Sequence, residues 1–337
     1  MSDGTAEPPQ RSMLRTGRAL VPGLLVAALA TLAAGFLADH YGAPLTLMAL
    51  LIGLALNFLG SDERLDPGLA FASKTLLRIG IVLVGLRITV GEVADLGLWS
   101  LLAIVAIVAL TMLAGVLAAR ALGFTAAFGV LAGGAVAICG ASAALAFATL
   151  LGERRASRAQ LTLVLVGISA MSAAAMFFYP IVAHALGFGD RAAGFMLGAA
   201  IHDVAQALGA GYSFSDPAGE TSAVVKLTRV ALLAPALLVV SLFLGRGESG
   251  RAGFGLPWFV LAFFAVAGIN SLGVVPAEAG ALGGSIAAAL LACAVAATGI
   301  RSPMAELMTA GPRPLLVIAV PTGAALLLSM LAAASIF

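Results

Sequence analysis

The sequence predicts an all-α polytopic membrane protein with about 10–11 transmembrane helices. Three observations predict it: hydrophobic residues make up 61% of the chain, charged residues only 10%, and long apolar stretches alternate with short polar breaks. Soluble domains carry about 25% charged residues, and a soluble fold has too little interior to bury this much apolar surface. We therefore expect a multi-pass protein of a bacterial inner membrane.

The apolar stretches are long enough to cross a bilayer, which takes about 20 helical residues. Spans are predicted at 19–38, 43–60, 68–90, 96–119, 124–151, 159–186, 192–212, 222–245, 255–276, 280–300 and 314–336. The polar residues 1–18 are expected to form a cytoplasmic N-terminal tail, and 19–337 a single transmembrane domain. The sequence leaves open whether the fifth segment crosses fully or is re-entrant.

An internal repeat links the two ends of this domain. Three short segments recur in the same order at an offset of 213 or 214 residues: 22–29 with 235–242, 56–60 with 269–273, and 85–87 with 299–301. Repeat one is expected at about 19–119 and repeat two at about 232–336, on either side of a central core segment at about 124–215. Because the offset covers seven segments, an odd number, we expect an inverted internal repeat of the kind common in secondary transporters.

The distribution of basic residues along the sequence does not decide the orientation. With a cytoplasmic N-terminus and Arg78 set aside, eleven fall on cytoplasmic ends and six outside if all segments cross, and the totals are the same if only the fifth is re-entrant.

A second likeness lies inside the central segment, where 137–145 resembles 200–208. Both stretches follow glycines, which allow either close helix packing or a helix break that exposes backbone groups in mid-membrane. We predict two broken helices, interrupted within 133–142 and within 198–206, with the interruptions facing one another near mid-bilayer.

The second of these stretches carries the candidate coupling residues. Asp203 is the only acidic residue well inside a predicted span, His202 precedes it, and Gln206 lies one turn beyond His202. An ionisable residue inside a membrane marks a functional site by default, and histidine titrates near physiological pH. We expect His202 and Asp203 to couple transport to protons or sodium, and His202 and Gln206 to contact substrate. The alternative is a hydrogen-bonded structural pair.

Two pairs of cations are candidates for binding an anion. Lys74 and Arg78 are four residues apart, and Lys226 and Arg229 three apart, so each pair is expected to share a helix face. Four cations against one carboxylate suit an anionic substrate, because Coulomb attraction is strong at low dielectric. The alternative is that the side chains snorkel to the interface.

Small and polar residues complete the candidate substrate site. Ser142 and the backbone around Gly140, with Cys139 beside it, are expected to hold an anion at a broken-helix N-terminus. Asn57 and Asn270 occupy equivalent repeat positions and either line the pathway or hydrogen-bond across helices. No catalytic, nucleotide-binding or metal-binding motif is present, so we expect no enzyme, cofactor or metal.

Four segments resemble the sulfate exporter family, the YeiH-type membrane proteins. They are 76–89, 138–142 (Ile-Cys-Gly-Ala-Ser), 201–206 (Ile-His-Asp-Val-Ala-Gln), and 226–230 followed by Ala234 and Pro235. The resemblance runs from about residue 19 to 336. It implies an inner-membrane secondary carrier whose fold resembles the cation/proton antiporters and bile-acid symporters, with crossed broken helices. Relatives tend to carry a Thr-Glu-Pro stretch where 148–152 reads Ala-Thr-Leu-Leu-Gly, which weakens the case for coupling through that helix.

These observations favour a secondary active transporter that exports a small anion, sulfate or an organosulfonate, coupled to protons or sodium. One alternative is a cation/proton antiporter that uses Asp203, and another is a membrane receptor or scaffold without flux. The expected partners are a small anion, a coupling ion and the lipid bilayer. Nucleic acid is excluded by the net charge of only +2, and the sequence leaves open a homodimer.

Overall fold

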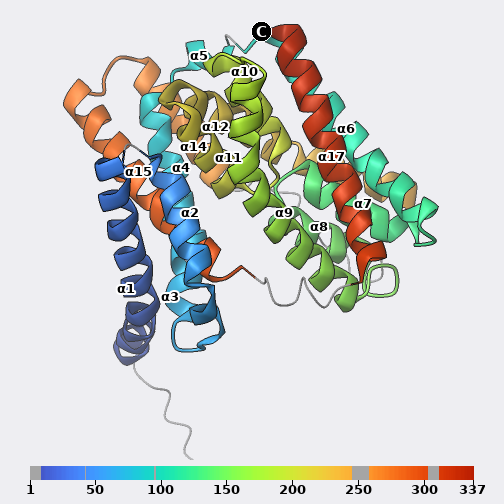
Figure 1. Cartoon of the computed structure of the whole chain (residues 1–337), viewed down its shortest axis with the longest axis horizontal. Coiled ribbons are helices and arrows are strands. Elements are labelled where there is room, and N and C mark those ends of the chain that lie inside the picture. The colour runs from blue at the N-terminus through green and yellow to red at the C-terminus, as the bar shows by residue number, and fades with distance from the viewer. Residues whose placement is uncertain (1–8, 42, 95, 245–257, 303–310) are drawn as a thin grey trace, which may run out of the picture.

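The computed structural model describes residues 9–41, 43–94, 96–244, 258–302 and 311–337, and these residues form an all-α structure without strands (Figure 1). Seven helices in them are long and apolar enough to cross a membrane. The predicted all-α, multi-pass membrane fold is confirmed. The first helix, α1 (Pro9–Tyr41), begins inside the predicted tail, and residues 1–8 of that tail lie outside the described residues.

Each predicted span corresponds to one or more helices. The long membrane-crossing elements are α1, α3–η2–α4–η3 (Asp66–Phe71, Ala72–Leu76, Leu77–Val84, Gly85–Arg87), α6 (Gly97–Ala121), α9 (Arg158–Ala185), α12–α13 (Asp216–Ala231, Leu233–Leu244), α15 (Ala277–Ile300) and α17 (Pro312–Ile336). The shorter helices are α2 (Leu45–Ala55) with η1 (Asn57–Ser61), α5 (Val90–Ala94), α7 (Ala126–Ala137), α8 (Ala141–Leu151), α10 (Asp190–Ala200), α11 (Val204–Phe214) and α14 (Trp258–Ser271).

Helices α7 and α8 fold back on each other as a helical hairpin. The ring of Phe147, in α8, packs directly on Gly134, in α7. Residues 13 positions apart would lie about 20 Å apart along a continuous helix, so this contact requires the chain to reverse at 138–140. The fifth segment is therefore re-entrant.

Helices α10 and α11 form a second hairpin. Ala218 of α12 lies against both Gly194 of α10 and Gly211 of α11, which are 17 residues apart in the sequence. Residues 17 positions apart would be about 25 Å apart along one continuous helix, so both can contact Ala218 only if α10 and α11 run antiparallel along α12. The interruptions occur within the predicted ranges, and both segments are hairpins with their tips inside the protein. This answers the question left open for the fifth segment, whereas the predicted crossing at 192–212 is replaced by a hairpin.

The helices form two bodies joined by few contacts. The scaffold body consists of α1, α2, α3, α4, α14 and α15, and the core body of α6 to α12 with α17. In Figure 1 the scaffold is on the left in blue and orange, and most of the core is on the right in green and red. The bodies meet mainly where α11 packs on α2 and α15, and where α12 approaches α4 and α14.

The two sequence repeats run in opposite directions. Gly80 of α4 lies by Leu290 and Leu291 of α15, whereas Leu86, further along, lies by Gly283. Corresponding helices α4 and α15 are therefore antiparallel, as an inverted repeat requires.

The repeat-equivalent asparagines make reciprocal contacts. The Asn57 amide donates to the Gly299, Ile300 and Ser302 carbonyls at the end of α15, and Asn270 donates to the Ile88 carbonyl just after η3. Each asparagine thus joins the end of the second helix of its own repeat to the end of the third helix of the other repeat.

The arginines gather on one face of the molecule. The face where α1 begins and α2, α6 and α15 end, called here the N-terminal face, lies at the bottom of Figure 1, and the C-terminal face, where α17 ends, at the top. Of the arginines at these ends and loops in the described residues, only Arg87 and Arg191 lie on the C-terminal face. Those on the N-terminal face are Arg18, Arg64, Arg120, Arg154, Arg155, Arg158, Arg301 and Arg313.

Candidate functional site

The tips of the two hairpins meet inside the protein. Tip one, residues 138–140, ends in Gly140, whose φ of +67° is strained for residues with a side chain. A Cβ on Gly140 would lie 3.8 Å from the His202 carbonyl oxygen and 3.9 Å from the Asp203 Cα, so tip two, residues 201–203, lies directly beside it. The predicted meeting of the two interruptions is present.

Two cations on α12 fill the space behind the tips. Lys226 and Arg229 are fully buried. The Lys226 ammonium donates to the carbonyls of Ile138 and Ile201, one from each tip, both at 2.7 Å. It therefore ties the two hairpins together.

The Arg229 guanidinium extends this arrangement along both hairpins. It donates to Val136 and Ala137 at the end of α7, and to Gly198 and Ile201 at the end of α10, at 2.6–3.1 Å. The last carbonyls of a helix lack intrahelical partners and carry the negative end of its dipole. The two cations thus cap the C-terminal ends of α7 and α10, and snorkelling does not describe either of them.

The N-terminal ends of the returning helices face away from these cations. Gly140 is the N-cap of α8 and supplies no side chain to the first amides of that helix. Asp203 is the N-cap of α11, and its carboxylate accepts a hydrogen bond from the Gln206 amide at 3.1 Å. The positive end of α8 therefore has no carboxylate cap, whereas that of α11 is capped by a carboxylate.

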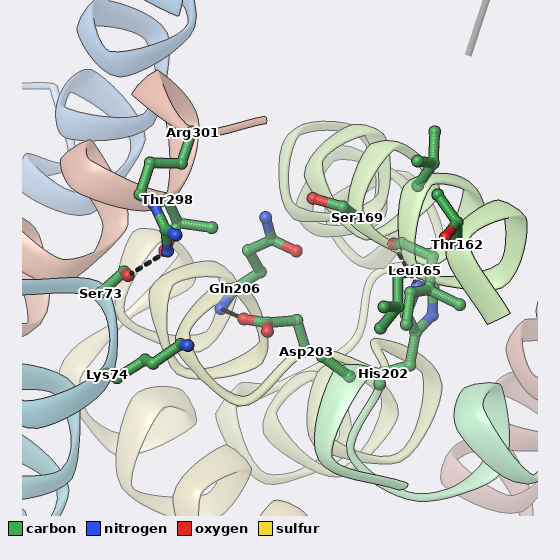
Figure 2. A pocket seen from close by; sticks show the side chains of 14 residues that line it. Ser73, Lys74, Thr162, Leu165, Ser169, His202, Asp203, Gln206, Thr298 and Arg301 are labelled. Atoms are coloured by element: carbon green, nitrogen blue, oxygen red, sulfur yellow. Dashed lines mark hydrogen bonds between the residues drawn. The ribbon is translucent and has the colours of Figure 1, made fainter. Parts of the chain in front are cut away.

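A cavity of about 440 Å³ lies in front of these two helix N-termini, between the core and the scaffold. The core contributes both tips and one face of α9, and the scaffold contributes η2 and the end of α15. Figure 2 shows Lys74, Asp203 and Gln206 directed into the same space. The lining residues are Ser73, Lys74, Gly140, Ala141, Thr162, Leu165, Val166, Ile168, Ser169, His202, Asp203, Gln206, Thr298 and Arg301.

The charges of the cavity differ in how they are paired. Arg301 donates to the Asp66 carboxylate at 3.0 Å and to the Ser73 hydroxyl at 3.2 Å, so its charge is balanced within the scaffold. The Lys74 ammonium forms no hydrogen bond or ion pair with the part of the chain that the structure describes. Lys74 is thus a cation available to a ligand.

Lys74 lies in a turn of π-helix beside the cavity. Residues Ala72–Leu76 form this wider turn, which is frequent at functional sites. Lys74 lines the cavity, whereas Arg78 is outside the lining, with its guanidinium carbon 5.9 Å from the centre of the Phe259 ring. Only Lys74 of this predicted pair is therefore placed to meet a ligand in the cavity.

His202 and Gln206 line the cavity, and each has a buried polar atom. His202 Nε2 lies 2.7 Å from the Ile168 carbonyl oxygen, and because a carbonyl only accepts, this nitrogen carries the hydrogen. His202 Nδ1 and Gln206 Oε1 are buried and have no partner among the described residues. Both atoms can accept a hydrogen bond from a ligand or a water molecule.

The remaining candidate residues lie outside the cavity lining. Cys139 is buried in tip one, and Ser142 is exposed on the first turn of α8. Asn57 and Asn270 join helix ends of the two repeats, and Lys226 and Arg229 lie behind the tips.

The sequence reasoning missed Ser73, Thr162, Ser169, Thr298 and Arg301 as lining residues. One signal pointed to Arg301, because it closes the repeated Gly-Ile-Arg segment that matches Gly85-Leu-Arg87. Hydroxyl residues inside apolar spans give no comparable signal.

Comparisons with known proteins match nearly the whole chain. A model of the family described as "Conserved hypothetical protein 698" matches residues 18–318. The chain is 44% identical to the UPF0324 membrane protein TauZ of Paracoccus denitrificans, over 90% of each chain, and 44% identical to TauZ of Paracoccus pantotrophus, over 86% of this chain and 88% of that one. A UPF0324 membrane protein of Chlorobaculum tepidum is 43% identical over 87% of this chain and 83% of its own. No solved structure matches.

Proposed function

The chain belongs to the conserved hypothetical protein 698 family, the UPF0324 membrane proteins, and on that premise we propose that it is a secondary active transporter of a small oxyanion such as sulfate or an organosulfonate. The observation that carries the proposal is the cavity where two hairpin tips meet. It combines the Lys74 ammonium, which has no partner among the described residues, with the N-terminus of α8, which has no carboxylate cap.

Each lining group has a role suited to an anion. Helix N-termini bind oxyanions through their free amides and dipole, so the first turn of α8 would take one side of the ligand. Lys74 would supply the opposing positive charge, and the hydroxyls of Ser73 and Thr298 lie beside it on the scaffold. The apolar side chains of Leu165 and Val166 leave room for a short organic group.

Lys226 and Arg229, on the side of the tips away from the cavity, help to keep the electrostatic potential in the cavity positive. Without Lys226 and Arg229, the C-terminal ends of α7 and α10 would bring negative dipole ends close to the bound anion. These two cations act on the substrate through the tips, not by contact. This assignment replaces direct contact of Arg78, Lys226 and Arg229 with the anion.

Asp203 is the carboxylate of the cavity and our candidate for coupling. It lies on tip two and caps α11, so a proton or sodium ion bound there would change the charge beside the anion. His202, with its free Nδ1, lies next to it. Coupling at this point would link the charge of the site to the position of the tip.

The architecture supports alternating access. Inverted repeats with substrate sites at interrupted helices near the membrane centre are the plan of many secondary transporters, in which one bundle moves against the other. Here the core body carries both tips, and the scaffold carries Lys74 and Arg301. A movement of the core along the scaffold would carry the site between the two faces.

The arginine distribution supports a direction of transport. Basic residues favour the cytoplasmic side, so we assign the N-terminal face to the cytoplasm of a bacterial inner membrane. The cavity extends from the tips toward Thr162, Thr298 and Arg301, which lie near that face. This structure therefore corresponds to a state that loads substrate from the cytoplasm, which suits export.

The test is flux in proteoliposomes loaded with labelled sulfate, a small alkanesulfonate, acetate or chloride, under an imposed proton or sodium gradient. We expect gradient-dependent movement of sulfate or the sulfonate, and much slower movement of the other two. Sodium/proton exchange abolished by Asp203→Asn, with no anion flux, would replace the proposal by the antiporter. Absence of any flux from monodisperse, correctly inserted protein would leave a receptor or scaffold.

A further inference from the structure

The internal repeat gives Arg301 a counterpart on the opposite face, Arg87, and the two arginines are paired differently. Arg301 binds Asp66, so its ion pair stays within the scaffold. Arg87, at the end of η3 in the scaffold, instead binds two carboxylates of core helix α12: Asp216 at 3.1 Å and Glu220 at 2.9 Å. An ion pair therefore joins the two bodies at the C-terminal face, while at the N-terminal face they are separated by the cavity.

A crevice lies directly behind the Arg87 ion pair. It has a volume of about 210 Å³ and runs between scaffold helices α2, α4 and α15 and the core residue Tyr212. The Tyr212 hydroxyl is buried without a partner among the described residues. Ala287, on the crevice wall, is only 2% exposed. The crevice and the large cavity thus lie toward opposite faces along one boundary between the bodies.

The two bodies are in direct contact between the crevice and the cavity at the hairpin tips. The Thr46 hydroxyl, in scaffold helix α2, donates to the Gly209 carbonyl of core helix α11 at 2.9 Å. This neutral hydrogen bond and the Arg87 ion pair are contacts that a separation of the bodies at the C-terminal face must break. The ion pair lies at the outer edge, where the Arg87 side chain is 31% exposed and that of Glu220 is 22% exposed.

We propose that Arg87, with Asp216 and Glu220, is the clamp that closes the C-terminal face of the transporter, and that its release opens the crevice behind it as the exit route. The inference rests on the proposed transport function. Arg87 is a positioning residue that never contacts the substrate in the loading cavity. A partly exposed ion pair contributes about 1 kcal/mol, or about a fivefold shift in the equilibrium between the closed and the open C-terminal face. Such a contribution favours the closed face and still allows it to open.

The test measures access to a cysteine placed behind the clamp. Ala287→Cys is reacted with a small, membrane-impermeant methanethiosulfonate applied at the C-terminal face, without substrate. The parent protein gives the background, because Cys139 and Cys293 are buried. We expect Arg87→Gln to raise the reaction rate about fivefold, and Glu220→Gln to raise it similarly. Arg64→Gln, which breaks an exposed ion pair with Asp62 on the other face and outside the cavity, should leave the rate unchanged.

A charge swap separates clamping from general destabilisation. Arg87→Glu combined with Glu220→Arg should return the rate toward the parent value, whereas each change alone should raise it. Unchanged rates in Arg87→Gln and Glu220→Gln, or an equal increase in Arg64→Gln, would overturn the clamp. If anion flux fails while the labelling pattern holds, only the transport proposal falls; normal flux with unchanged labelling removes only the clamp.

Discussion

Arg229 is expected to contribute more to stability than any other charged side chain of the described core. It is fully buried, and its guanidinium donates five hydrogen bonds to four carbonyls, two at the end of α7 and two at the end of α10. Arg229→Met keeps much of the apolar volume but removes every donor. The carbonyls of Val136, Ala137 and Gly198 would then face a dry interior.

The expected cost follows from these groups. Each buried polar group left without a partner costs about 1–3 kcal/mol, and removing one member of a buried charged network costs about 3–5 kcal/mol. We take about 3–5 kcal/mol, because Lys226 still holds Ile201 and the methionine fills part of the space. With an unfolding entropy of about 2 cal/mol/K per residue, this corresponds to a Tm lowered by about 4–7 °C.

The assay is thermal unfolding of purified protein in detergent, followed by size-exclusion chromatography of the remaining monodisperse fraction. Arg78→Met is the matched control, because Arg78 is exposed and lies against a single ring. We expect a change below about 1 °C for that variant. Arg229→Lys should fall between the two, since a lysine keeps the charge but not the fork of donors. Equal Tm values for Arg229→Met and Arg78→Met would refute the capping role.

Two further predictions concern packing and the second tip. Gly53 of α2 lies directly against the Ala296 carbonyl of α15, so Gly53→Ala should lower the free energy of unfolding by about 1–3 kcal/mol. Gly35 has open space around it, so Gly35→Ala should be neutral or stabilising by up to about 1 kcal/mol. The same thermal unfolding assay compares the two variants. Asp203→Ala should lose about 1 kcal/mol of helix capping and Asp203→Asn only a few tenths. If both Asp203 variants unfold at one temperature, the carboxylate does not cap α11.

The sequence carried enough information for the membrane fold and the repeat. Apolar stretches of about 20 residues have few soluble alternatives, and the offset shared by Asn57 and Asn270 reflects reciprocal contacts that the structure contains. The glycine clusters before 138–140 and 201–203 correctly located the two interruptions. A local pattern sufficed in these cases because the physical constraint is local.

The direction of the chain after each interruption was beyond the sequence. A broken helix that crosses and a hairpin that returns have the same composition, and only contacts such as Phe147 on Gly134 distinguish them. The count of basic residues failed for this reason, because it treated segment 192–212 as a crossing. Likewise, Lys74 lines the cavity and Arg78 does not, which depends on how the two bodies meet and could not be read from the spacing of the two residues.

The central claim is that the cavity at the hairpin tips binds an oxyanion through Lys74, and equilibrium binding of labelled sulfate or a small alkanesulfonate to detergent-purified variants tests it most directly. A hydrogen bond to a charged group contributes about 1.5–3 kcal/mol, so Lys74→Gln should weaken binding about 10- to 100-fold. Arg78→Gln, one turn further along the same helix but outside the cavity, should leave the affinity within about twofold. Equal losses in the two variants, or full affinity in Lys74→Gln, would contradict the account.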